Sequence, residues 1–212
     1  MTYDSFNCLR RTVKALYESA AEELHFHNFD HIEFVLKTAC TIAEEIGADK
    51  ALVEAAALLH DVNYLVERGP NSKPEVGREL RNSMLANVGY TTLTIDRIED
   101  IILESHTGYR SATITKEGMA LSDADTLFKS LPITPILNAQ RFCVQTGISI
   151  IELARKIVIE QDPLMVDGIY FYTEYANGKY LHWAQTNLQL WKNVLEWYES
   201  DLFTPKATQL TE

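Results

Sequence analysis

His60 and Asp61 stand out as residues whose types and setting suggest chemistry. They end an apolar run, residues 55–59 (Ala-Ala-Ala-Leu-Leu), that is typical of a buried helix. A buried imidazole and a buried carboxylate cost free energy unless something compensates for their lost hydration. A divalent metal ion does so, because it binds neutral imidazole nitrogen and carboxylate oxygen together. The alternative is a helix end with both side chains solvated, so the metal interpretation requires further ligands nearby.

His31 is one candidate for such a ligand. It stands near the start of the helix that precedes the Ala-rich one. Two antiparallel neighbours joined by a short turn place the start of the first beside the end of the second. The alternative is a surface histidine at a helix start. Asp125 and Asp123 are the carboxylate candidates. Residues two apart on a helix point in different directions, so we expect only one of the two to coordinate the ion bound by His60 and Asp61. Spacing does not choose between them, and Asp125 also fits a helix-start capping pattern with Ser122.

Two more histidines could take part in the chemistry. His27 precedes His31 by one helical turn, so the two would share a helix face and His27 could act as a general acid for a leaving oxygen. A solvated turn histidine is the alternative. His106 ends an Ile-rich segment. It could bind a second metal or the substrate phosphate, or cap its helix C-terminus as a cation.

Helical periodicity runs through most of the chain, and strand-like alternation is sparse. We therefore expect an all-α fold with one domain over residues 1–203 and a tail at 204–212. Loops are expected at 67–74 and 107–117, where Gly, Pro and polar residues gather. The predicted helices cover residues 5–23, 32–46, 52–66, 75–88, 96–105, 119–131, 136–145, 149–161 and 180–202.

Composition narrows the class of partner and the location. The 212-residue chain has a formal net charge of −11, which argues against a nucleic-acid polymer or an anionic membrane as its main partner. Cys8, Cys40 and Cys143 are far apart and form no CxxC pair, so we expect free thiols in a reducing cytosol. The first residues lack the features of a signal peptide, and no apolar run approaches the length of a membrane span. We expect a cytoplasmic protein.

Taken as a set, His31, His60-Asp61 and Asp125 resemble the H…HD…D pattern of the HD-domain superfamily of metal-dependent phosphohydrolases. Residues 56–61 resemble the central helix of that family. Residues 117–125 resemble its final-Asp segment, particularly in small stand-alone bacterial HD hydrolases. The second Asp of such a segment is usually the ligand, so the resemblance favours Asp125.

The segment from His27 to His31 (HNFDH) is similar to the HNxxH element of cyclic-nucleotide phosphodiesterases and related HD proteins. There the first histidine is the proposed proton donor and the second is a metal ligand. The resemblance covers residues 25 to about 130. It implies a single compact helical HD-domain bundle, with additional helices at 135–203.

The resemblance implies one divalent metal ion (Mn, Fe, Co, Ni, Zn or Mg) held by four ligands, namely His31, His60, Asp61 and Asp125. The ion would activate water to cleave a phosphate ester or anhydride, in a nucleotide or a related small phosphorylated metabolite. Asp61 would orient that water, and His27 would protonate the leaving oxygen.

Two cations could offset the phosphate charge. Lys129 lies one helical turn after Asp125 and thus on the same face, and Arg110 lies in the loop after His106. A solvated lysine is the alternative for Lys129. We expect substrate specificity to come from residues 67–74, residues 107–117 and the aromatic C-terminal helices, which could also form a homodimer face.

The chain departs from subfamily patterns at two points. Val62-Asn63-Tyr64 stands where some HD nucleotidases and synthetases carry an acidic pair. The two additional histidine ligands typical of binuclear HD-GYP and HD oxygenase sites are represented at most by His106. Two alternative functions remain: an HD-type di-iron oxygenase, which needs a second metal, and a non-catalytic metal- or nucleotide-binding sensor.

Overall fold

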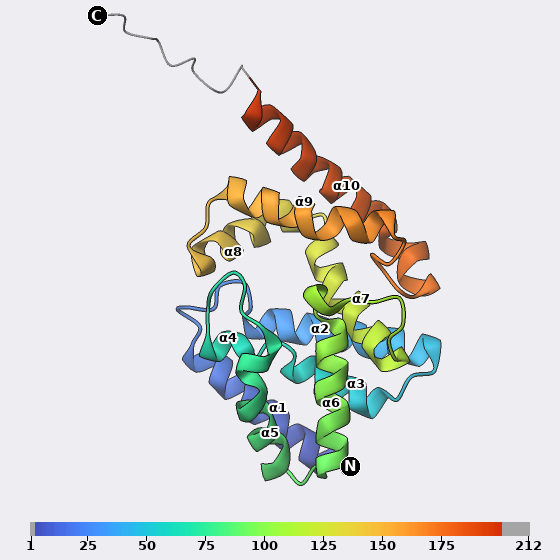
Figure 1. Cartoon of the computed structure of the whole chain (residues 1–212). Helices are drawn as coiled ribbons and strands as arrows, with labels where there is room; N and C mark the ends of the chain where they lie inside the picture. The colour runs from blue at the N-terminus through green and yellow to red at the C-terminus, as the bar shows by residue number, and fades with distance from the viewer. Residues whose placement is uncertain (1–2, 201–212) are drawn as a thin grey trace, which may run out of the picture.

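The computed structural model describes residues 3–200, and over that range the chain forms helices and turns with no strand (Figure 1). The all-α prediction is confirmed. None of the described helices is both long and apolar enough to cross a lipid bilayer. The predicted tail at 204–212 lies outside the described residues. In chain order the helices are α1 Tyr3–Ser19, α2 Phe29–Ile46, α3 Lys50–Leu59, α4 Asn63–Val66, α5 Arg78–Asn87, α6 Thr92–Ser105, α7 Lys116–Ser130, α8 Ala139–Thr146, α9 Ile150–Val166 and α10 Glu174–Glu199.

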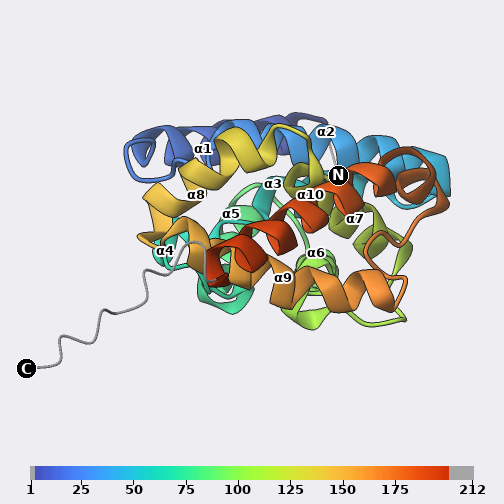
Figure 2. The same ribbon diagram turned by 90° about the horizontal axis from the view of Figure 1, so that it is seen from above.

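Helices α1–α7 form a bundle around α3. This Ala-rich helix contacts α1, α2, α6 and α7, and its small side chains let those helices approach closely. Helices α8, α9 and α10 form a second layer over the bundle (Figure 1), and in Figure 2 α10 passes over α2 and α7, which it contacts. A separate apolar cluster joins this layer to the segment before α2; its buried members are Phe26, Ala139, Phe142, Leu153, Ala154 and Trp191.

The connection between α2 and α3 is short and capped on both sides. The Asn28 side chain accepts a hydrogen bond from the backbone N–H of His31 (3.0 Å), which starts α2. Gly47 ends α2 in the left-handed region (φ 65°), where a residue without Cβ is favoured. Asp49 then caps the first turn of α3. The resulting antiparallel pair puts the start of α2 beside the end of α3, as the sequence predicts.

Several predicted helix boundaries are wrong. α3 ends at Leu59 rather than near residue 66, because the chain tightens into a turn in which the Val62 N–H donates to the Leu59 carbonyl (3.1 Å). α7 begins at Lys116, capped by the Thr115 side chain, so the Ser122-x-x-Asp125 pattern does not start a helix. α10 begins at Glu174 rather than near residue 180, because Thr173 caps it there. The predicted capping box at the start of α9 is confirmed.

A buried ion pair fixes the loop before α5. Arg81 and Glu99 are almost fully buried, and Arg81 binds the carboxylate through two nitrogens, at 2.8 and 2.5 Å. Its third nitrogen donates to the carbonyl of Pro74 (2.8 Å). Gly77 packs closely against the backbone of Asn63, where an added Cβ would stand 2.7 Å from the Asn63 nitrogen. Arg81 therefore anchors the end of the 67–74 loop against the bundle.

Arg81→Met should leave the Glu99 carboxylate buried without its partner. Breaking such a pair from one side costs about 3–5 kcal/mol, so urea denaturation should show a loss of that size in the free energy of unfolding. Arg78→Met is the matched control, since Arg78 is exposed on the same helix, and it should change stability by less than about 0.5 kcal/mol. Equal stabilities of the two variants would contradict the anchoring role.

Candidate functional site

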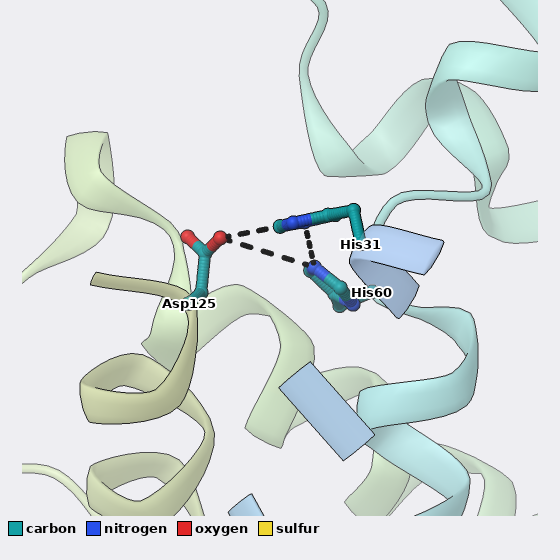
Figure 3. Close-up of side chains that lie close together, drawn as sticks. All are labelled: His31, His60 and Asp125. Atoms are coloured by element: carbon teal, nitrogen blue, oxygen red, sulfur yellow. Dashed lines mark hydrogen bonds and ion pairs between the residues drawn. The ribbon is translucent and has the colours of Figure 1, made fainter. Parts of the chain in front are cut away.

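Three helices of the bundle bring four polar side chains to one point. His31 lies in the first turn of α2, His60 and Asp61 directly follow α3, and Asp125 lies within α7. These positions meet because α2, α3 and α7 pack on one another. Figure 3 shows His31, His60 and Asp125 directed toward each other. We call these four residues the ligand cluster.

The ligating atoms of the cluster lie within a few ångströms. The Nε2 atoms of His31 and His60 are 3.2 Å apart. Oδ1 of Asp125 lies 3.6 Å from the His31 nitrogen and 4.0 Å from the His60 nitrogen. Oδ2 of Asp61 lies 2.9 and 3.2 Å from the same two nitrogens. These four atoms come from three segments of the chain, and the potential ligand atoms of His31, His60 and Asp125 all lie within 4.8 Å of one another.

The ligand cluster fits a divalent metal ion. Oδ2 of Asp61 is buried, and in the described part of the chain it has no hydrogen-bond partner although two imidazoles flank it. His60 donates its Nδ1–H to the carbonyl of Ala57 (2.8 Å), which leaves the Nε2 lone pair available to the cluster. Such an outer bond is the usual way to orient a metal-binding histidine. Imidazole nitrogen with carboxylate oxygen suits a divalent transition metal.

The two carboxylates of the cluster are held ionised. Burial disfavours the charge on Asp61, but the neighbouring His60 above all outweighs it and holds the pKa of Asp61 well below its usual range. Burial also acts on Asp125, yet Lys129 above all lowers the pKa of Asp125 to about 2. Lys129 donates from Nζ to Oδ2 of Asp125 at 2.6 Å, which leaves Oδ1 facing the histidines. Anionic oxygen is therefore available near neutral pH.

Asp123 has a different task. Its fully buried carboxylate accepts hydrogen bonds from the backbone N–H groups of Tyr172 (2.7 Å) and Thr173 (2.9 Å), and from the Thr173 hydroxyl (2.7 Å). Burial raises the pKa of Asp123 despite these bonds. Asp123 thus holds the segment before α10, and Asp125 is the carboxylate of α7 that lies in the cluster.

His27 is buried close to the cluster. Its ring stacks on Tyr64 with centroids 3.5 Å apart and planes 12° from parallel. Its Nδ1 lies 2.8 Å from the side-chain nitrogen of Gln145 on α8. Burial lowers the pKa of His27 to about 3, so the ring rests as neutral imidazole at pH 7. The predicted proton donor is therefore placed by residues from both layers.

A cavity of about 300 Å³ opens beside the ligand cluster, between the bundle and the second layer. Its wall includes His60, Asp61 and Asp125, and residues 70–74 of the predicted specificity loop. The second layer contributes apolar side chains, namely Phe142, Leu153, Ile157, Leu164 and Trp191. The cations of the wall are Lys73, Arg110, Lys129 and Lys156. A small molecule with a charged end and an apolar end matches such a lining.

His106 and Arg110 line the same cavity, but both already make hydrogen bonds within the chain. The His106 Nδ1 accepts a hydrogen bond from the Gly108 N–H (3.2 Å), and burial lowers its pKa. His106 is not part of the ligand cluster. Arg110 donates to the carbonyls of Ile169 (3.0 Å) and Tyr170 (2.7 Å), which ties the segment before α10 to the cavity wall. The substrate or second-metal role of His106 and the phosphate role of Arg110 stay predictions.

The family model of the HD domain matches residues 28–129. The chain contains an HD domain. HD domains are generally metal-dependent hydrolases that bind divalent metals, and the whole ligand cluster lies inside the matched stretch. His27 and α8–α10 lie outside it. No curated protein matches the chain.

The fold of this HD-domain protein recurs in solved structures of low sequence identity. A protein from Lactobacillus plantarum superposes with a TM-score of 0.68 at 17% identity, covering 95% of this chain and 98% of that one. Bacillus subtilis YpgQ in complex with ADP gives 0.64 at 21% identity, covering 91% and 94%. Lin1889 from Listeria innocua gives 0.55 at 18%, covering 95% and 99%. This likeness shows a shared fold that includes the second layer.

Sequence reasoning missed Tyr64 and Gln145. Tyr64 follows His60 by about one helical turn, and that spacing could have drawn attention to it. Gln145 is 118 positions from His27, and no local pattern marks it. The sequence predicts a specificity role for the aromatic C-terminal helices without singling out Trp191, which the packing of the two layers brings to the cavity.

The two aspartates of α7 provide a matched test. Asp125→Asn removes an anionic ligand, so metal content measured by elemental analysis should fall at least about tenfold below that of the wild type. Asp123→Asn should retain the metal but lose about 2–3 kcal/mol of stability, because it weakens charge-assisted bonds to the segment before α10. Metal loss in Asp123→Asn together with full metal content in Asp125→Asn would show that the assigned carboxylate is the wrong one.

Proposed function

We propose that this protein is a metal-dependent phosphohydrolase that cleaves a phosphate ester or anhydride in a nucleotide or a related small phosphorylated metabolite. The observation that carries the proposal is that three members of the ligand cluster, His60, Asp61 and Asp125, line a cavity whose wall also contains lysines. Imidazole and carboxylate ligands suit the ion, while Lys129 and Lys73 suit the phosphate charge. The HD-domain match and the resemblance given above support the same chemistry.

The residues of the ligand cluster would hold the ion and position the attacking water next to the substrate phosphate. A divalent ion bound by His31, His60, Asp61 and Asp125 would lower the pKa of a bound water and so make hydroxide available near neutral pH. Asp61 would orient that water through a carboxylate oxygen, as the resemblance implies. Attack would form a bond from the water oxygen to phosphorus while the bond from phosphorus to the leaving oxygen breaks, and the proton of the water would pass to solvent.

A lysine of the bundle would offset the negative charge of the transferred phosphoryl group. Lys129 remains within the cavity wall while it pairs with Asp125, so its ammonium faces both a ligand and the space for substrate. His27 would offer its N–H to the leaving oxygen as negative charge develops there. Its neutral resting form favours a role as hydrogen-bond donor over the full proton transfer that the resemblance implies.

The apolar wall from the second layer would bind the rest of the substrate. Phe142, Leu153 and Trp191 offer aromatic and aliphatic contacts away from the ligand cluster, as a nucleoside or another partly apolar group requires. The ADP complex of YpgQ, which shares this fold, also supports a nucleotide as the substrate class.

The proposal is tested by release of phosphate or pyrophosphate from a nucleotide panel, with Mn, Mg, Co or Fe added. We expect hydrolysis that a chelator abolishes and added metal restores. Asp61→Asn keeps the size of the side chain but removes a ligand charge, and it should lower kcat/KM at least about 100-fold. Hydrolysis that survives both treatments would contradict the assignment of this site.

A control separates the alternative functions by their products. Two irons per chain with oxygen consumption and no phosphate release would indicate the di-iron oxygenase. Saturable nucleotide binding without any product would indicate the sensor. Either result would overturn the hydrolase proposal while leaving the fold unaffected.

A further inference from the structure

Gln145 links the second layer to the segment that carries His27. It lies in the last turn of α8, outside the stretch that matches the HD domain. Its Oε1 accepts hydrogen bonds from the backbone N–H groups of Phe26 and His27, both at 3.0 Å. Its side-chain nitrogen lies 2.8 Å from the His27 Nδ1. One side chain thus meets both the backbone and the ring of a residue in the cavity wall.

The two backbone contacts determine which way the Gln145 amide faces. A backbone N–H can donate but cannot accept, so the atom that meets both of them must be the amide oxygen. The NH₂ group is then left to face the His27 ring. Because that group can only donate, Nδ1 of His27 must accept and carries no proton. The proton of the neutral ring therefore sits on Nε2, at the edge away from Gln145.

Packing holds the His27 ring in this orientation. Tyr64 covers one face in a stacked arrangement. The rings of Phe26 and Phe142 meet His27 edge to face, with centroids 4.7 and 5.9 Å away. His27 is only 5% exposed and lines the cavity beside the ligand cluster. The ring therefore has little freedom to exchange its two edges.

We propose that Gln145 is a positioning residue, which fixes His27 as the Nε2–H tautomer and so presents that N–H to the leaving oxygen of the phosphate substrate. This inference rests on the proposed hydrolase function for the identity of the acceptor. It gives the second layer a part in the reaction besides binding: a residue from α8 sets the hydrogen-bonding character of a group near the ligand cluster. A fixed donor needs no reorganisation as charge develops on the leaving oxygen.

A purely structural role for Gln145 is the competing explanation, because its Oε1 contacts alone would tie α8 to the segment before α2. Two substitutions separate the roles. Gln145→Glu keeps an oxygen for the two backbone N–H groups but turns an acceptor toward Nδ1. Gln145→Met removes both functions. Gln140→Met is the control, since Gln140 is exposed on the same helix.

The first readout is the tautomer, which needs no activity. In ¹⁵N-histidine NMR spectra of the full chain, we expect the wild type and Gln140→Met to show His27 with a protonated Nε2 and a bare Nδ1. Gln145→Glu should place a proton on Nδ1. An unchanged His27 pattern in Gln145→Glu, in a folded protein, would overturn the inference whether or not the protein is a hydrolase.

The second readout is a double-mutant cycle in the hydrolysis assay. Gln145→Met should lower kcat about 10- to 100-fold with KM changed less than about threefold, the range lost with a positioned hydrogen-bonding group. The same change made in a His27→Ala background should have no further effect, because Gln145 acts through His27. Effects that multiply in the double variant, or full kcat in Gln145→Met, would overturn the inference. A wild type without hydrolysis would instead overturn the proposed function, and the tautomer result would still decide whether Gln145 controls His27.

Discussion

The structure depends on the cost of burying two imidazoles and two carboxylates at one junction of the bundle. His31 and His60 are almost fully buried, and Asp61 and Asp125 are mostly so. Like charges and bare lone pairs at such short distances destabilise a fold unless a cation lies among them. Lys129 neutralises part of one carboxylate. The negative charge that Lys129 leaves unpaired is the electrostatic basis for a divalent ion. Buried alanines in α2, α3 and α7 let these three helices come close enough to share the site.

The second layer completes what the bundle begins. Two side chains of the bundle, Asp123 and Arg110, hold the segment just before α10 by bonds to its backbone. That segment carries the layer into place, so that Trp191 and its neighbours close the apolar side of the cavity. Gln145 then reaches back to His27. Catalytic chemistry, as we propose it, is therefore distributed over both layers, although the HD match ends at residue 129.

Much of this arrangement could be predicted from the sequence because its signals are local. Helical periodicity predicts the all-α class, and the His-Asp pair at the end of the Ala-rich run, together with His31, predicts where the polar side chains meet; the family resemblance adds Asp125. Antiparallel pairing of α2 and α3 follows from the glycine and the aspartate between them. These features need no knowledge of distant residues. The homodimer face and the cytoplasmic location stay predictions.

Other features depend on distant partners, and local patterns do not show them. Spacing alone leaves Asp123 and Asp125 nearly equivalent, and only the family resemblance favours Asp125. In the folded chain Asp123 binds the backbone of Tyr172 and Thr173, which lie far away in the sequence. Arg110 is a cation suited to bind phosphate, but in the folded chain it donates hydrogen bonds to the carbonyls of Ile169 and Tyr170. Helical periodicity alone predicts that this helix continues to residue 66, but α3 ends at Leu59 and Asp61 lies in the turn that follows.

The most direct test of the account is anomalous diffraction from crystals grown with Mn²⁺. We predict one strong peak among the ligand cluster, at about 2.0–2.3 Å from Nε2 of His31 and His60 and from carboxylate oxygens of Asp61 and Asp125. Such a peak would establish the ion on which the proposed water activation depends. A fully occupied peak elsewhere, with none in the cluster, would contradict the central claim.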